Sequence, residues 1–199
     1  MEFLPRSEVL TIEELLRTAR LFTELGVRKI RVTGGEPLIR RGVHELFEGL
    51  GALAGLDSLA LTTNGSQLAD SGPALRDAGV NSINISLDSL QAERFKAITR
   101  IGDLNTVLRG IDRAVECGFD RIRLNAVILD GLNRDEVVPL THYALERGIH
   151  IAFIEEMPLG QVNVGGKPLA YVSSDTLQEE LAEHFTCLLY TSPSPRDLL

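Results

Sequence analysis

Apolar and polar positions alternate along the chain in two rhythms, one typical of helices and one typical of strands. Residues 11–14 read Thr-Ile-Glu-Glu, a capping box, and apolar side chains then recur at helical spacing up to residue 25. Gly26 is the kind of residue that ends a helix. Residues 27–32 alternate apolar with basic side chains and predict a strand.

The same unit recurs along the chain. We expect further helices at residues 43–53, 72–78, 92–98, 104–117 and 134–146, and further strands at residues 58–62, 81–87, 121–129 and 150–155. After residue 156 the rhythm stops. Residues 160–166 predict a loop, and Ser174-Asp175 predicts the cap of a short helix that reaches His184.

Strands that alternate with helices predict an α/β fold with parallel βαβ units. Polar and glycine residues gather just after each of the five predicted strands. That pattern favours a partial (βα) TIM-type barrel, whose functional site lies at the carboxyl ends of its strands. A doubly wound open sheet has the same rhythm, and the pattern alone does not separate the two.

The composition narrows the class of protein. The chain has 199 residues, 44% of them apolar, and a formal net charge of −8. No run approaches the roughly 20 apolar residues of a membrane span, and the first residues do not read as a secretory signal, so we expect a cytoplasmic protein with no membrane partner. An acidic chain is a poor general binder of nucleic acid, although a few arginines suffice for a nucleotide.

The cysteine content excludes two kinds of site. Cys117 and Cys187 are the only cysteines and lie far apart in the sequence, which predicts neither a disulfide framework nor a metal-ligand set. Cys117 follows an apolar helical stretch and is interpreted as a small core residue.

The loop Gly34-Gly35-Glu36 directly follows a predicted strand. Its glycines permit a close approach of backbone to a ligand, and its carboxylate can accept hydrogen bonds from an ammonium group or a ribose hydroxyl. A structural turn with a solvated glutamate is the alternative. Arg31 alternates with Ile30 and Val32 and so faces the other way, toward a phosphate in a barrel or toward solvent if the strand is exposed.

Polar side chains also mark the later strands. Thr62 stands at the end of the second strand, Asn84 and Ser86 line one side of the third, and Arg123 and Asn125 share a side of the fourth. Each could instead satisfy backbone groups in the interior. Together they predict one polar ligand site at the mouth of the barrel.

Five segments, in this order and at this spacing, resemble the GTP 3′,8-cyclase family of radical S-adenosylmethionine (SAM) enzymes. They are residues 31–37 (RVTGGEP), 61–65 (LTTNG), 83–89 (INISLDS), 124–127 (LNAV) and 153–157 (FIEEM). The resemblance covers residues 2–186. The Gly-Gly-Glu-Pro loop marks radical SAM enzymes broadly, and the other segments in series are more specific to the cyclases.

The resemblance implies SAM, two [4Fe-4S] clusters and GTP. In that family a 5′-deoxyadenosyl radical made from SAM converts GTP to its 3′,8-cyclic form, for molybdenum cofactor biosynthesis. By position, the SAM site would include Gly35, Glu36, Ser86 and Met157, and the GTP site Arg31, Thr62 and Arg123. Arg123 stands where the family commonly has a lysine, so the charge is kept while the donor geometry differs. Without the resemblance, Met157 would be read as core filling.

The sequence departs from the family in its cysteines. The Cys-x3-Cys-x2-Cys motif would precede Met1, and a second set would follow the matched region. We therefore expect a fragment: a barrel core at residues 1–186, a tail at residues 187–199 that is not native, no metal ligands, and no turnover by this chain alone.

The family further implies a downstream pyranopterin synthase as a pathway partner and a homodimer as the assembly. Two other readings stay open, a radical SAM enzyme with another substrate and a cluster-free barrel that only binds or scaffolds.

Overall fold

Five parallel strands lie side by side in the order in which they occur in the chain. The computed structural model describes residues 9–156, 163–164, 167–168 and 170–186. The strands are β1 (Lys29–Val32), β2 (Ser58–Thr63), β3 (Val80–Ser86), β4 (Arg121–Asp130) and β5 (His150–Glu155). A short strand β8 (Ala170–Tyr171) pairs antiparallel with the end of β4, and β6 (Asn163–Val164) forms a separate two-stranded ladder with β7 (Lys167–Pro168).

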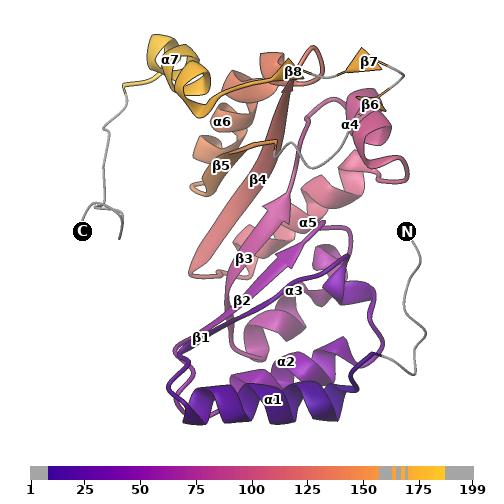
Figure 1. Cartoon of the computed structure of the whole chain (residues 1–199), viewed down its shortest axis with the longest axis vertical. Helices are drawn as coiled ribbons and strands as arrows, with labels where there is room; N and C mark the ends of the chain where they lie inside the picture. The colour runs from indigo at the N-terminus through magenta and orange to yellow at the C-terminus, as the bar shows by residue number, and fades with distance from the viewer. Residues whose placement is uncertain (1–8, 157–162, 165–166, 169, 187–199) are drawn as a thin grey trace.

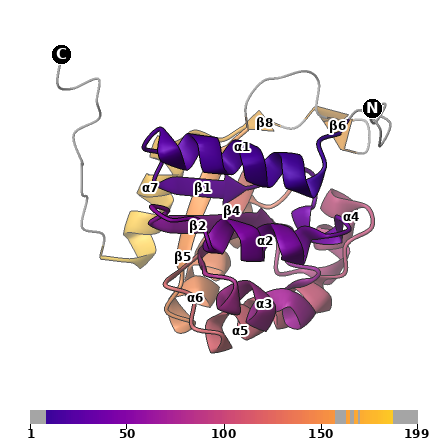
Figure 2. The same ribbon diagram turned by 90° about the horizontal axis from the view of Figure 1, so that it is seen from below.

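The helices connect these strands and pack over one face of the sheet (Figures 1 and 2). They are α1 (Ile12–Glu24), α2 (Val43–Gly51), α3 (Leu68–Asp77), α4 (Ala92–Thr99), α5 (Leu104–Glu116), α6 (Val137–Glu146) and α7 (Ser174–His184), with the 3-10 turns η2 (Pro37–Ile39) and η3 (Arg134–Glu136). None of the helices in the described ranges is long and apolar enough to cross a membrane.

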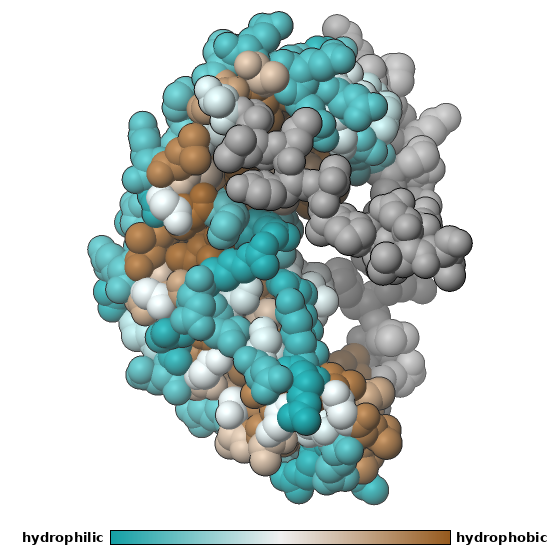
Figure 3. All heavy atoms as spheres, turned by 90° about the vertical axis from the view of Figure 1, so that its left-hand side faces the viewer, coloured by the Kyte–Doolittle hydropathy of each residue, from teal (hydrophilic) through white to brown (hydrophobic). Residues whose placement is uncertain are grey.

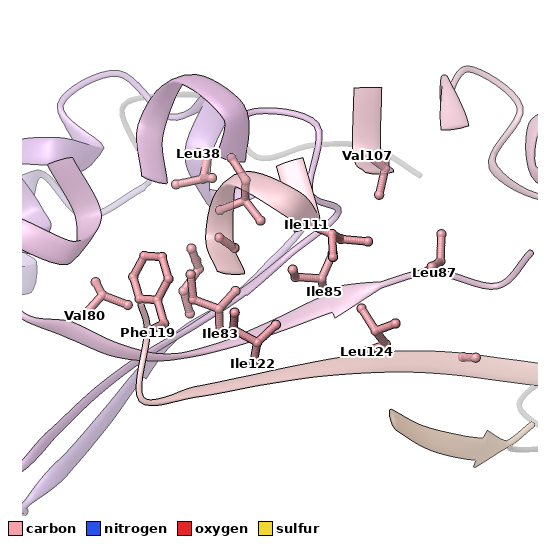
Figure 4. Packing of buried hydrophobic residues seen from close by; sticks show 14 of the residues in the cluster. Leu38, Val80, Ile83, Ile85, Leu87, Val107, Ile111, Phe119, Ile122 and Leu124 are labelled. Carbon is pink, nitrogen blue, oxygen red and sulfur yellow. The ribbon is translucent and has the colours of Figure 1, made fainter. Parts of the chain in front are cut away.

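The apolar strand positions form the core with the inner sides of the helices. Leu61, Ile83, Ile85 and Leu124 are fully buried. Ile111 of α5 belongs to the same cluster and lies beside Ile85 (Figure 4). These residues occupy alternate positions of their strands, so they all point to the helical side. Burying a side chain of this size stabilises the fold by about 1.5–3 kcal/mol each.

The strand order separates the two predicted architectures. A doubly wound sheet reverses its strand order at a switch point and carries helices on both faces. Here the order is β1-β2-β3-β4-β5 without reversal, and the helices lie on one side. Both features are those of a barrel segment, so the predicted partial (βα) barrel is confirmed.

Several predicted boundaries shift in the structure. The capping box of α1 forms in full, because Thr11 and Glu14 each bond the other's backbone N–H. Helix α3 begins at Leu68 rather than at residue 72, and Pro73 lies inside the helix. The prediction that Ser174-Asp175 caps the last helix was wrong, because Ser173 accepts the capping bond from Thr176.

Part of the predicted loop at residues 160–166 is strand β6. The rest of that loop, Met157, and the tail at residues 187–199 with Cys187 lie outside the described residues.

Strand β1 has one neighbour, β2, in the described part of the sheet. An apolar groove between α1, β1 and α2, lined by residues such as Leu15, Phe22 and Ile30, lies beside it. Phe22 is 52% exposed. An open strand edge beside exposed apolar surface is a template for pairing between chains.

We therefore expect the 199-residue chain to self-associate as its concentration rises from the micromolar range. Size-exclusion chromatography with light scattering measures this directly. A monomer at every concentration, with a cooperative thermal unfolding transition, would contradict the expectation.

Candidate functional site

The face of the sheet opposite the helices is polar. Residues in register on neighbouring parallel strands project to the same side, and the register places on this face Lys29, Arg31, Ser58, Ala60, Thr62, Ser82, Asn84, Ser86, Arg121, Arg123, Asn125 and His150. None of these twelve described residues is acidic. Figure 3 shows the molecule in profile, hollowed along one side.

Arg31 and Thr62, two of the predicted GTP residues, contact each other on this face. The Arg31 guanidinium donates to the Thr62 hydroxyl at 3.1 Å and to the Leu61 carbonyl at 3.4 Å. Arg123, the third, lies on the same face, in register with Asn84, which is in register with Thr62. The pKa of Arg123 is lowered, first by burial and then by the positive charges of Arg121 and Arg31. The three predicted residues therefore share one electropositive region.

The Gly34-Gly35-Glu36 loop extends from the carboxyl end of β1 toward open space. A Cβ atom added to Gly34 or Gly35 would meet no heavy atom within 4 Å. The Glu36 carboxylate is not free, because it accepts bonds from the Thr63 hydroxyl at 2.8 Å, the Asn64 N–H at 2.6 Å and the Leu38 N–H at 3.0 Å. Glu36 thus joins the loop after β1 to the loop after β2, and the loop backbone faces outward.

The loops after β3 and β4 are joined in a comparable way. The Asp88 carboxylate accepts from the Val127 N–H at 2.8 Å, which joins the tip of β3 to β4. Asn133, fully buried, donates to the carbonyls of Asp88 and Val127 and accepts from the Leu129 N–H. Burial raises the pKa of Asp88, and the bond from Val127 opposes that shift.

A buried ion pair also joins the loop after β3 to the turn η3 that follows β4. Glu136 is 2% exposed. Its carboxylate accepts hydrogen bonds from the Ser89 hydroxyl and the Leu90 N–H, both at 2.6 Å. Arg94 of α4 completes the set with a bond of 2.6 Å to Glu136 and further bonds to Asp135. Since each donor and acceptor in this set has a partner, the burial of the charge is compensated.

The predicted site residues therefore fall into three groups. Arg31, Thr62 and Arg123 are brought together on the polar face. Gly35 and Ser86 lie exposed at the carboxyl ends of β1 and β3, with Ser86 in register with Asn125. Met157 lies outside the described residues. Sequence reasoning did not find the residues that fix the loops, although Asp88 and Asn133 each stand just after a predicted strand, where such residues belong.

Comparison with known proteins places the chain in a defined context. The family model of the radical SAM superfamily matches residues 2–144. The chain is 52% identical over 185 residues to a protein named GTP 3′,8-cyclase from Saccharophagus degradans, a match that covers 93% of this chain and 56% of the relative. The corresponding protein of Pseudomonas entomophila is 53% identical over 186 residues, covering 94% and 56%. The chain thus spans a little over half the length of these relatives.

Solved structures confirm the fold at low sequence identity. HydG, a maturase of the [FeFe]-hydrogenase, matches with a TM-score of 0.65 and 16% identity over 88% of this chain and 42% of that one. The coproporphyrinogen III oxidase HemN from Escherichia coli matches with a TM-score of 0.61 and 17% identity over 86% of this chain and 43% of that one.

The residues present suit SAM better than they suit an iron–sulfur cluster. The outward backbone of Gly34-Gly35 leaves room for a cofactor to approach, and Ser86 offers an exposed hydroxyl at the neighbouring strand ends. A [4Fe-4S] cluster needs cysteine thiolates, and the chain has two cysteines. Cys117 caps the carboxyl end of α5, at the opposite end of the barrel, and packs beside Gly72. The described residues hold no group of three side chains suited to a metal, so they do not offer the ligands that the cluster needs.

Replacing Glu36 tests its role in joining the loops. We expect Glu36→Ala to lower the free energy of unfolding by about 2–3 kcal/mol, because it leaves the Asn64 N–H and the Thr63 hydroxyl without their partner. Hydrogen exchange of the Asn64 amide should accelerate in the folded protein. Glu48→Ala on the exposed side of α2 is the control. An Asn64 amide that stays as protected as before would show that Glu36 does not hold this loop.

Asp88 gives a test by pH. Its pKa is raised from the ordinary value of 3.8, so the folded state holds the proton more tightly than the unfolded state, and stability is lost as the pH rises through that interval. Asp88→Asn keeps an acceptor for Val127 without the charge. We expect this variant to be the more stable at pH 7, with the difference shrinking toward pH 4, as measured by urea unfolding. Asp77→Asn, at an exposed position, should show no such trend. A constant difference from pH 7 to pH 4 would contradict the assignment.

Proposed function

The chain belongs to the radical SAM superfamily, and from that premise we propose that it forms the central part of a GTP 3′,8-cyclase. The reaction converts GTP to (8S)-3′,8-cyclo-7,8-dihydroguanosine 5′-triphosphate in molybdenum cofactor biosynthesis, a lyase activity. The observation that carries the proposal is the identity of about half of all residues, across 93% of this chain, with a protein of that name. The structural neighbours, at 14–17% identity, bear on the fold alone.

The geometry supports two binding regions, one for SAM at the carboxyl ends of the strands and one for GTP further down the strands. Gly35 lies beyond the end of β1, and Ser86 is the last residue of β3. Together with the backbone of the loop that contains Glu36, they suit SAM. Met157 is added to them on the family resemblance alone. Arg31 and Arg123 lie further down their strands and suit the phosphates of GTP, which guanidinium groups recognise through paired hydrogen bonds. Thr62 orients Arg31.

For the 199-residue chain by itself, the cysteine content favours a second and narrower function. Two cysteines cannot bind the cluster that radical SAM chemistry requires. On this proposal the chain alone performs no turnover, and binding of GTP is the function left to it. The remaining parts of the proposal follow from the family resemblance: a cytoplasmic location, a homodimer, and a pyranopterin synthase that consumes the product.

A chimera tests the activity. Residues 2–186 of this chain would replace their counterparts in the Saccharophagus degradans relative, which supplies the rest of the protein. Anaerobic assays with SAM, reductant and GTP should yield the cyclic nucleotide. A chimera that holds its full complement of iron and sulfide and binds SAM, yet forms no cyclic product, would contradict the proposal.

Two variants of the chimera separate GTP from SAM. We expect Arg31→Gln and Thr62→Val each to weaken GTP affinity roughly 10–100-fold, as the loss of a charge-assisted hydrogen bond does. SAM affinity should change less than about twofold. Arg20→Gln, on the exposed side of α1, is the matched control. Equal losses of GTP and SAM affinity would favour a radical SAM enzyme with another substrate.

A further inference from the structure

Asn64 and Gly65 stand directly after β2, and this pair of residues can react with itself. The sequence has seven asparagines, and Asn64 is the only one that glycine follows. The backbone nitrogen after an asparagine can attack the side-chain amide carbon, and glycine hinders this attack least because it has no Cβ atom. Asn64 is exposed, so water reaches its side chain, while Gly65 is buried and held within the fold.

An Asx turn holds the two reacting atoms in one small ring. The Oδ1 atom of Asn64 accepts a hydrogen bond from the Ser66 N–H at 2.9 Å. The ring that this bond closes contains both the Cγ atom of Asn64 and the backbone nitrogen of Gly65. Attack of that nitrogen on Cγ places negative charge on Oδ1, where the Ser66 N–H already donates. This N–H therefore acts as an oxyanion hole does.

Two further hydrogen bonds lead from the Gly65 nitrogen to a carboxylate. The Gly65 N–H donates to the Thr63 hydroxyl at 3.1 Å, and that hydroxyl donates to Glu36 Oε1 at 2.8 Å. Thr63 is 2% exposed, so this path is shielded from water. An amide nitrogen becomes a nucleophile as its proton leaves, and a carboxylate reached through a hydroxyl can take that proton. Glu36 also accepts from the Asn64 N–H at 2.6 Å, which fixes the turn relative to this base.

We propose that Asn64 is a deamidation site, converted to aspartate or isoaspartate by a reaction that its own neighbours promote. The Gly65 nitrogen bonds to Cγ of Asn64, and its proton passes to the Thr63 hydroxyl, whose own proton passes to Glu36. The Cγ–Nδ2 bond then breaks, and Nδ2 takes up a proton returned through water and leaves as ammonia. The succinimide that remains is opened by water at either carbonyl, so the reaction needs no oxidant, reductant or other reactant.

The product changes the loops that Glu36 joins. Aspartate and isoaspartate each bring a carboxylate beside that of Glu36, which already contacts the backbone of residue 64. Like charges in such proximity repel each other, and isoaspartate also lengthens the backbone by one methylene group. Deamidation should therefore loosen the link between the loop after β1 and the loop after β2. None of this depends on the proposed function.

Mass spectrometry of the 199-residue chain during incubation at neutral pH tests the proposal. We expect the peptide that contains Asn64 to gain the mass that separates aspartate from asparagine, and a methyltransferase specific for isoaspartate to label it. The folded chain should react at least about tenfold faster than the same chain in urea, because general-base assistance commonly contributes more than that. The other six asparagines serve as internal standards, and Asn64→Gln should abolish the signal.

Thr63→Val separates a proton path from a simple restraint on the turn. Valine has nearly the same shape but no hydroxyl, and the substitution leaves Glu36 its bonds to the Asn64 and Leu38 N–H groups. We expect the reaction to slow by about tenfold, whereas release of a merely restrained turn would accelerate it. Thr63→Ser keeps the hydroxyl and should react at the rate of the parent chain.

Three results would each overturn the inference: an Asn64 that stays unmodified, a folded chain that reacts no faster than the chain in urea, and a folded Thr63→Val variant that reacts as fast as the parent or faster. Cleavage of the chain after residue 64 in place of deamidation would also overturn it, since Nδ2 would then be the attacking atom. Should Thr63→Val not fold, Glu36→Gln takes its place, because it removes the base and must slow the reaction in the same way.

Discussion

Side chains that alternate along parallel strands impose one constraint on the whole molecule: each strand must bury one side and expose the other. In this chain the buried side carries residues such as Leu61, Ile83 and Leu124, which pack beneath the helices. The remaining positions then lie together on the opposite face, which carries Arg31, Thr62 and Arg123. The same packing that stabilises the fold therefore assembles the polar face, and a shift of one residue in register would exchange the two sides.

The carboxyl ends of the strands need a second kind of restraint, because loops carry few apolar contacts. Polar side chains that bond to backbone groups supply it. Glu36 fixes the first two loops to each other, and Asn133 with Asp88 fixes the third to the fourth. These groups hold backbone in place and leave Gly35 and Ser86 open to a ligand. A carboxylate in a ligand-binding loop can thus act by positioning that loop, which is a different role from contacting the ligand.

Much of this arrangement could be predicted from the sequence, because local patterns encode it. Periodicity gave each of the five strands to within about two residues, and the alternation of Arg31 with Ile30 and Val32 placed that arginine on the correct face. The choice between a barrel and a doubly wound sheet could not be made, since strand order depends on contacts between distant segments. The hydrogen bonds by which Glu36 and Glu136 join separate loops were missed for the same reason, because their partners lie 27 and 47 residues away. The start of α3 was misplaced, and the helix runs through Pro73, a residue that usually stands in the first turn.

The central claim is that the concave polar face, and not the helical side, receives the nucleotide with its phosphates among the arginines. A crystal structure of the chain soaked or grown with GTP tests this most directly. We expect phosphate oxygens within hydrogen-bonding distance of the guanidinium groups of Arg31 and Arg123. A nucleotide bound anywhere else on the chain, with those guanidinium groups still facing solvent, would contradict the account.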